Sequence, residues 1–155
     1  MNMDDLISAV QSLNAEDAFH SSLTVEQWRV LAAYLTQHEI RTGDLLIKQG
    51  DSDRTMYFLA QGSLQIFVTG GAPGSSRIAI LRAGSVVGEP SLFDDGPRMA
   101  NVEAMTGCML WALRGPRLEE FAQRSPSLAL AVLRAAGSVL ARRLRANLAR
   151  QIPFT

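Results

Sequence analysis

The stretch that decides the fold runs Gly88–Glu89–Pro90–Ser91–Leu92–Phe93–Asp94–Asp95–Gly96–Pro97–Arg98–Met99–Ala100. Pro90 favours the first position of a short helical turn, because proline lacks the N–H that would be unpaired there. The run Asp94–Asp95–Gly96–Pro97 predicts a tight turn. The stretch therefore places one acid, Glu89, and one base, Arg98, next to the N–H groups of a helix start.

These groups suit a compact ligand that carries an anionic phosphate and a sugar hydroxyl. A helix start offers amide donors and a favourable field to a phosphate. The planar guanidinium of Arg98 matches phosphate oxygens. An ionised Glu89 can only accept hydrogen bonds, so it suits a ribose hydroxyl. For an isolated pattern of this kind, the alternative is a surface turn with a solvated Glu and Arg.

The context of the stretch favours the binding interpretation. The run Gly88-Glu89-x-Ser91-Leu92-Phe93…Pro97-Arg98-x-Ala100-x-Val102-x-Ala104 resembles the phosphate-binding cassette of cyclic nucleotide-binding domains. That family includes the catabolite activator protein, the regulatory subunits of protein kinase A and the gating domains of cyclic nucleotide-modulated channels. Glycine-punctuated segments similar to the family's early strands are Gly43–Asp44, Gln49–Gly50–Asp51, Tyr57–Phe58–Leu59 and Gln61–Gly62–Ser63. The resemblance covers roughly residues 23 to 150.

The resemblance implies a fold, a ligand and a set of site residues. The fold is mainly β: an antiparallel double-stranded β-roll, jelly-roll-like, with N-terminal helices and a long C-terminal helix. The ligand is a cyclic nucleotide, with cyclic AMP favoured over cyclic GMP, and no separate cofactor or metal is implied. The expected binding residues are Val87, Gly88, Glu89, Pro90, Ser91, Arg98, Met99 and Ala100. Three of them depart from the family pattern: Val87 replaces an aromatic residue, Pro90 a Leu or Met, and Met99 a Ser, Thr or Ala.

Length and composition favour a single domain with a sizeable hydrophobic core. The chain has 155 residues, 47% hydrophobic and 19% charged, and no apolar run is long enough to cross a bilayer. The start of the chain lacks the pattern of a signal peptide. A single cysteine, Cys108, permits no internal disulfide, so we expect a cytoplasmic protein. Cys108 lies in an apolar run and is interpreted as a buried strand residue, with a redox sensor as the alternative.

The chain divides into helical, β and helical segments. Residues 1–40 are expected to hold helices at 3–12 and 25–35, the second opened by a capping box of Thr24 with Gln27 and anchored in the core by Trp28. Residues 41–115 are expected to form the β-roll, with the cassette at 88–100. Strands are predicted at 45–48, 56–60, 63–69, 76–81, 86–87, 99–105 and 108–113, and a hairpin loop at 70–76. That loop lacks the Lys-Ser/Thr ending of a nucleotide triphosphate loop.

Residues 116–155 are expected to return to helix. A short helix at 117–122 precedes a long one at about 127–150, which Ser127 is expected to cap. The long helix carries apolar residues at three- and four-residue spacing, namely Leu130, Leu133, Ala136–Gly137, Leu140, Leu144 and Leu148. This stripe fits a helix packed on its own roll. It fits equally the family's C-terminal helix, which covers the bound base, dimerises, or does both.

These observations predict a regulatory module that binds a cyclic nucleotide and signals through its C-terminal helix. The alternative is a structural or dimerisation module of the same fold that has lost the ligand, with Glu89 and Arg98 paired to each other. An enzyme is the least expected class, because no nucleophile–base pair, paired carboxylates or metal cluster is visible. His20 and His38 lie far apart, with no ligand-spaced partner.

Charge and chain length bear on the partners of such a module. Residues 98–155 hold nine arginines against three glutamates, a bias that fits solvated helix faces or an acidic surface partner. From the sequence we expect no DNA-reading module after the long helix. It resembles cyclic nucleotide domains attached to bacterial sulfate-permease-like and other multidomain proteins. We therefore expect a stand-alone bacterial sensor or the regulatory domain of a larger effector.

Overall fold

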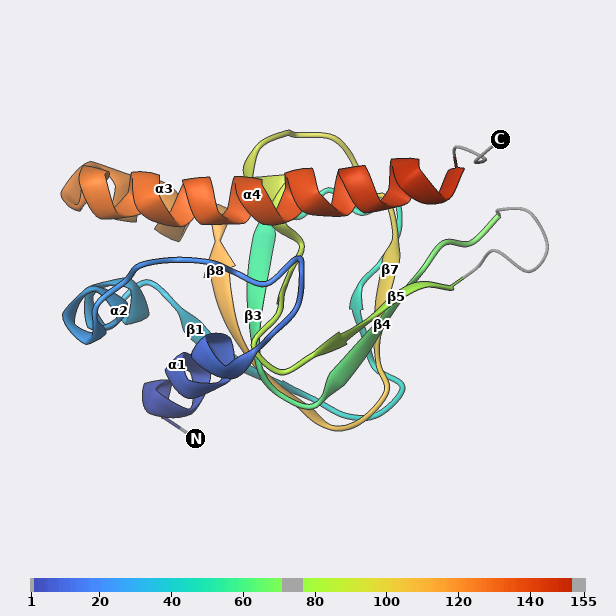
Figure 1. Ribbon diagram of the computed structural model, residues 1–155, viewed down its shortest axis with the longest axis horizontal. Helices are drawn as coiled ribbons and strands as arrows, with labels where there is room; N and C mark the ends of the chain where they lie inside the picture. The colour runs from blue at the N-terminus through green and yellow to red at the C-terminus, as the bar shows by residue number, and fades with distance from the viewer. Residues whose placement is uncertain (1, 71–76, 152–155) are drawn as a thin grey trace.

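Two four-stranded antiparallel sheets form the centre of the molecule (Figure 1). The computed structural model describes residues 2–70 and 77–151. The first sheet has the order β1-β8-β3-β6 and the second the order β2-β7-β4-β5. The strands are β1 (Thr36–Ile40), β2 (Leu45–Ile47), β3 (Thr55–Gln61), β4 (Ser63–Phe67), β5 (Arg77–Arg82), β6 (Val86–Val87), β7 (Asn101–Ala104) and β8 (Cys108–Arg114). The β-roll expected from the sequence is confirmed.

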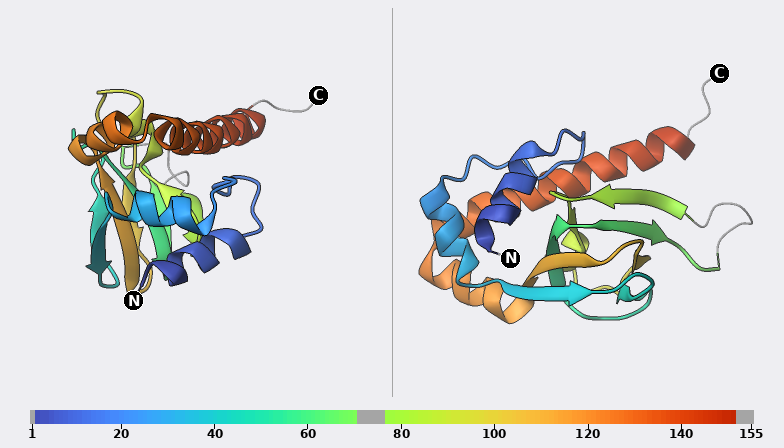
Figure 2. Two further views of the ribbon diagram at one scale, coloured as in Figure 1. Left: turned by 90° about the vertical axis from the view of Figure 1, so that its left-hand side faces the viewer. Right: turned by 90° about the horizontal axis from the view of Figure 1, so that it is seen from below.

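The helices flank the roll at both ends of the chain. They are α1 (Met3–Ser12), α2 (Val25–Ala32), η1 (Glu89–Leu92), α3 (Gly115–Arg124) and α4 (Pro126–Gln151). The predicted capping box at α2 is present, since Thr24 and Gln27 exchange side-chain and backbone hydrogen bonds. Figures 1 and 2 show α4 as one long, straight helix that lies across the roll. Helices α1 and α2 lie beside the roll. None of the helices in the described residues is long and apolar enough to cross a membrane.

Two buried clusters hold these layers together. One lies between the helices and the first sheet and is centred on Trp28, Phe58 and Phe121. Phe19 stacks edge-on against Phe58 with ring centroids 5.2 Å apart. The other cluster lies between the two sheets and includes Cys108, which is buried as the strand interpretation predicted. The core positions expected for Trp28 and Cys108 are therefore confirmed.

The long helix packs on the roll through a face that includes only part of the apolar stripe seen in the sequence. The residues of α4 that are buried on the roll are small or β-branched, namely Ala129, Val132, Ala135, Ala136 and Val139. Ala136 belongs both to this buried set and to the stripe, whereas Leu130, Leu144 and Leu148 of the stripe are each about half exposed, at 49%, 57% and 47%. Leu133 is partly buried and packs against the first cluster. The roll therefore covers part of the stripe and leaves its other leucines partly open to solvent or to a partner.

Other differences from the sequence predictions concern boundaries. Strand β1 was not expected, because residues 36–40 were assigned to the N-terminal helical region. The second helix ends at Ala32, short of residue 35. The strand expected at 99–105 is limited to residues 101–104. The long helix begins at Pro126, so Ser127 lies inside it and does not cap it. The loop expected at 70–76 falls outside the described residues from residue 71 onward.

Candidate functional site

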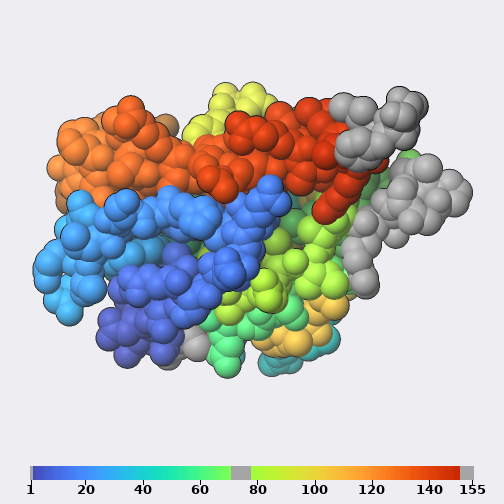
Figure 3. All heavy atoms as spheres, viewed as in Figure 1, coloured from blue at the N-terminus to red at the C-terminus, as the bar shows by residue number. Residues whose placement is uncertain are grey.

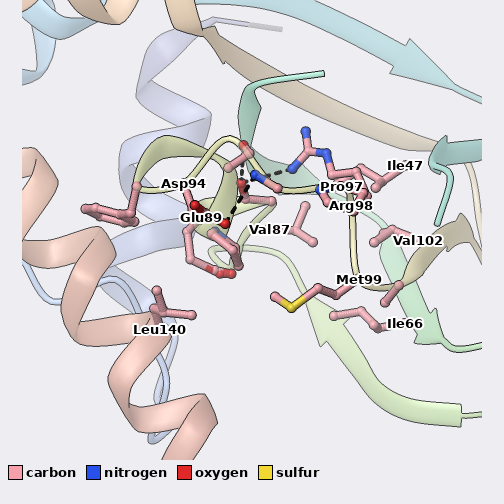
Figure 4. Close-up of a pocket in the computed structure, with 16 residues that line it drawn as sticks. Ile47, Ile66, Val87, Glu89, Asp94, Pro97, Arg98, Met99, Val102 and Leu140 are labelled. Atoms are coloured by element: carbon pink, nitrogen blue, oxygen red, sulfur yellow. Dashed lines mark hydrogen bonds between the residues drawn. The ribbon is translucent and has the colours of Figure 1, made fainter. Parts of the chain in front are cut away.

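A cavity of about 530 Å³ opens between the second sheet, the expected cassette and α4. The eight binding residues expected from the sequence, Val87, Gly88, Glu89, Pro90, Ser91, Arg98, Met99 and Ala100, all line this cavity. Their neighbours in its wall are mostly apolar and were not expected from the sequence: Ile47, Ile66, Phe93, Val102 and Leu140. Figure 4 shows Leu140, on α4, on the same side of the cavity as Glu89. Met99 and Ile66 lie on the opposite side. The structure therefore brings the predicted residues together in one site.

The cassette enters this site through a glycine that nothing else can replace. Gly88 has φ of 81°, in the left-handed region. A Cβ at this position would lie 2.7 Å from the Thr55 carbonyl oxygen and 2.9 Å from Nη1 of Arg98. The turn of 3-10 helix expected from the sequence follows, but it begins at Glu89, so Pro90 is its second residue rather than its first. Gly88 thus lets the backbone pass directly beneath the guanidinium of Arg98.

Arg98 is held firmly at the floor of the cavity. Its residue is 7% exposed. Nε and Nη2 donate to the two carboxylate oxygens of Asp53, at 3.2 Å and 2.8 Å. Nη2 also donates to the Thr55 carbonyl oxygen at 2.6 Å, and Nη1 to the Gly88 carbonyl oxygen at 3.1 Å. Since a guanidinium has five N–H groups, these four bonds leave one N–H on Nη1 for a ligand.

Glu89 is a buried acid whose charge is balanced by the long helix. It is 3% exposed. Nη1 of Arg143, on α4, donates to both of its carboxylate oxygens, at 2.6 Å and 2.9 Å. Burial raises the pKa of Glu89 above its ordinary value, and the charge and hydrogen bonds of Arg143 act against that rise. A carboxylate can accept more than two hydrogen bonds, so Glu89 keeps acceptor capacity toward the cavity.

Arg143 ties three separated segments together. Besides Glu89, its guanidinium binds Asp17 through Nε at 2.9 Å and the Val86 carbonyl oxygen through Nη2 at 2.8 Å. Asp17 belongs to the segment between α1 and α2, and Val86 begins β6. The C-terminal helix, the cassette and the N-terminal segment therefore meet at one guanidinium.

The pairing of Glu89 and Arg98 with each other, which the sequence left open, does not occur. Each has its own partner, Arg143 and Asp53, and neither partner was predicted. The sequence signal for Arg143 was faint, since it was one of several arginines beside the leucine stripe. Asp53 follows a glycine turn in a polar segment and carried no signal. In the described residues, no group of three or more His, Cys, Asp or Glu side chains is placed to hold a metal ion.

The expected helix start offers a ligand fewer amides than predicted. Pro90 has no N–H, and the N–H of Ser91 donates to the Gly88 carbonyl oxygen at 3.3 Å. The hydroxyl of Ser91 donates to the Gly88 carbonyl oxygen at 2.8 Å. Charge from Arg98 is therefore the strongest feature of this site toward an anion, rather than the helix start.

Comparisons with known proteins agree with this fold. The profile of the cyclic nucleotide-binding domain family matches residues 37–125. The "Cyclic AMP receptor protein" of Thermus thermophilus is 30% identical over 127 residues, 82% of this chain and 56% of that protein. The "cAMP-dependent protein kinase regulatory subunit" of Dictyostelium discoideum is 34% identical over 97 residues, 61% of this chain and 29% of that protein. The chain thus spans between about a quarter and a little over half the length of these two relatives.

A solved structure extends the likeness of the fold to the whole chain. The crystal structure of a cyclic nucleotide-binding domain from Methylobacillus flagellatus superposes with a TM-score of 0.81, covering 99% of this chain and 85% of that one. Its sequence identity is 20%, so the likeness concerns the fold alone. The profile match spans more than half of the chain and includes the cassette with Glu89 and Arg98. This chain belongs to the cyclic nucleotide-binding domain family.

Proposed function

We propose that residues 1–155 form one regulatory unit that binds a cyclic nucleotide in the cavity above the cassette. The observation that carries the proposal is the pair of buried, oppositely charged side chains, Glu89 and Arg98, in the wall of one largely apolar cavity. Burying two charges is costly, and each is held in place by a partner from another segment. A ligand with an anionic phosphate and a hydroxyl-bearing ribose matches both groups.

Each predicted residue has a role in this arrangement. The remaining N–H of Arg98 donates to a phosphate oxygen, and Glu89 accepts from the ribose hydroxyl. Gly88 and Pro90 set the path of the backbone, and Ser91 fastens that path through its bond to Gly88. Met99 and Ala100 follow Arg98 in the cavity wall and supply their backbone N–H groups, since neither has a side-chain donor. Val87 closes the apolar floor.

The outer part of the cavity favours cyclic AMP over cyclic GMP. The base must extend from the ribose toward Ile66, Phe93 and Leu140, which carry no hydrogen-bonding groups in their side chains. Guanine presents more polar edge groups than adenine. Polar groups buried without a partner cost free energy, so the apolar lining penalises guanine more strongly.

Signalling through α4 is supported by its contacts with the cassette. Leu140 forms part of the cavity wall, and Arg143 binds Glu89. Gly137 faces Phe93 of the cassette, with 3.8 Å between a Cβ placed there and Cζ of Phe93. A ligand shifts a helix between two positions only by binding them with different affinity. The phosphate contact is common to both positions, so base contacts with Leu140 and changes around Arg143 supply the difference.

The second candidate is a ligand-free dimerisation module, and one observation favours it. Leu130, Leu144 and Leu148 form an exposed stripe along α4, at a spacing typical of helix pairs. The two functions are compatible, because a second copy on this stripe would lie beside Leu140. Leu144→Asp tests the stripe: we expect a dimer by sedimentation to become a monomer, and a monomeric wild-type chain contradicts the idea.

Binding itself is tested by isothermal titration of the full chain with cyclic AMP and cyclic GMP. We expect saturable binding of one nucleotide per chain, with cyclic AMP the tighter ligand. Absence of binding heat with both nucleotides favours the ligand-free module. We place the unit in the cytoplasm, alone or as part of a larger effector protein, on the grounds of its single buried thiol and its longer relatives.

A further inference from the structure

A second cavity, of about 330 Å³, lies on the other side of the Glu89–Arg143 pair. Its walls come from the segment after α1, from β5 and from the C-terminal half of α4. Figure 3 shows these three parts, blue, yellow-green and red, meeting on the face toward the viewer. Its charged lining residues are Glu16, Asp17, Arg82, Arg142, Arg143 and Arg150. Four arginines against two carboxylates leave an excess of positive charge.

Three of the four arginines form no ion pair with a described residue. Arg143 is paired with Asp17 and Glu89. Among the described residues, Arg82, Arg142 and Arg150 have no carboxylate partner. The residues outside the described ranges, 1, 71–76 and 152–155, contain no Asp or Glu. With Glu89 counted beside Glu16 and Asp17, four arginines face three carboxylates, and an excess of positive charge remains.

The contacts that these arginines do make are with neutral oxygens. Arg142 donates to the Glu16 carbonyl oxygen at 3.1 Å and to the Ser138 hydroxyl at 3.3 Å. Arg150 donates to the Ile78 carbonyl oxygen at 3.4 Å. No hydrogen bond to a described residue engages the side chain of Arg82. Guanidinium forks bind phosphate oxygens in pairs, and several donors remain available around this one hollow.

We propose that the second cavity binds a small phosphate-bearing anion, and that its occupancy is linked to the nucleotide cavity through Arg143. Arg143 lines the second cavity and also binds Glu89 in the wall of the first. An anion beside Arg143 offers its guanidinium an alternative partner and so weakens its hold on Glu89. The anion site stands on its own charges, and only its effect on nucleotide affinity rests on the proposed function.

The site is tested with inorganic pyrophosphate as the probe, by calorimetry at constant ionic strength. We expect saturable binding by the wild-type chain, weakened about tenfold or more by Arg82→Gln or Arg150→Gln, since each removes charge-assisted hydrogen bonds. Arg145→Gln is the matched control, because Arg145 is an exposed arginine of the same helix that does not line the cavity. Equal weakening by all three variants would mean general charge screening and would overturn the site.

The location and the link are tested by amide chemical shifts in the absence of any nucleotide. Pyrophosphate is expected to shift the amides of Arg82, Ala146 and Asn147, and also that of Glu89. Shifts confined to Arg98 and its neighbours would place the anion in the nucleotide cavity and overturn the proposal. Shifts in the second cavity without any at Glu89 would refute the link.

The same probe separates this proposal from the proposed function. If both hold, saturating pyrophosphate lowers the affinity for cyclic AMP severalfold, and cyclic AMP lowers that for pyrophosphate by the same factor, because coupling between sites is reciprocal. Pyrophosphate binding without cyclic AMP binding supports the second site and contradicts the proposed function. Cyclic AMP binding without pyrophosphate binding supports the proposed function and contradicts the second site.

Discussion

Replacing Glu89 by glutamine tests the ribose contact most selectively. The substitution keeps the size of the side chain and one acceptor oxygen but removes the charge. A hydrogen bond to a charged group contributes about 1.5–3 kcal/mol. At about 1.4 kcal/mol per factor of ten, Glu89→Gln should weaken cyclic AMP binding by about 10- to 150-fold. The contact is at the upper end of its usual strength because the residue is only 3% exposed.

The same substitution should hardly affect a ligand without the hydroxyl. We expect 2′-deoxy cyclic AMP to bind wild type and Glu89→Gln with nearly equal affinity, so the four calorimetric titrations form a double-difference cycle. Glu89→Gln also changes the surroundings of Arg143, and Asp17→Asn controls for that. It removes the other carboxylate partner of Arg143 without altering the nucleotide cavity, and it should reduce affinity far less. Equal weakening of both ligands by Glu89→Gln would show that Glu89 does not bind the 2′-hydroxyl.

Three further predictions concern the phosphate contact, pH and the long helix. Arg98→Ala should weaken cyclic AMP binding about 10- to 150-fold, because a charge-assisted bond to the phosphate is lost. It should also lower the unfolding free energy by about 1–3 kcal/mol, because the buried Thr55 carbonyl oxygen loses its short hydrogen bond. A folded variant with wild-type affinity in calorimetry would contradict the phosphate role. Since burial raises the pKa of Glu89 above 4.5, the native state binds the proton more tightly. Urea titrations should therefore show the unfolding free energy falling as pH rises from about 4.5 through that raised pKa, a slope absent in Glu89→Gln. Deleting residues from Ala141 onward should lower the affinity for cyclic AMP yet leave some binding. In the full chain, cyclic AMP should slow hydrogen exchange in α4. Full affinity after truncation would refute the role of the helix.

The cassette was predictable because its chemistry is local in sequence. The left-handed glycine, the proline of the helical turn and the two charged residues all lie within thirteen residues, and the structure places them in one cavity wall. The sequence alone also predicted most strands, because apolar β-branched runs alternate with glycine turns. The edge strand β1 escaped notice because Thr36–Gln37–His38–Glu39 is polar and lacks an alternating apolar face.

Long-range partners could not be predicted in the same way. Asp53 and Arg98 are separated by 45 residues, and Arg143 lies 54 residues from Glu89. Nothing in the local pattern distinguishes Arg143 from the other arginines of its helix. The sequence left open how α4 packs, because apolar residues occur around more than one face of the helix and only tertiary packing decides which of them meet the roll. The structural role of Arg98 likewise depends on carbonyl oxygens from Thr55 and Gly88 that the fold brings together.

Amide chemical-shift mapping of cyclic AMP on the full wild-type chain tests the central claim most directly. The nucleotide should shift the amides of Gly88, Glu89 and the Arg98–Ala100 segment, together with those near Leu140 on α4, in a saturable titration. The chemical shifts of amides in the first helix, such as those around Val10, should not change. Absence of saturable shifts at Glu89 and Arg98, or shifts located elsewhere on the roll, would contradict the binding of a cyclic nucleotide in this cavity.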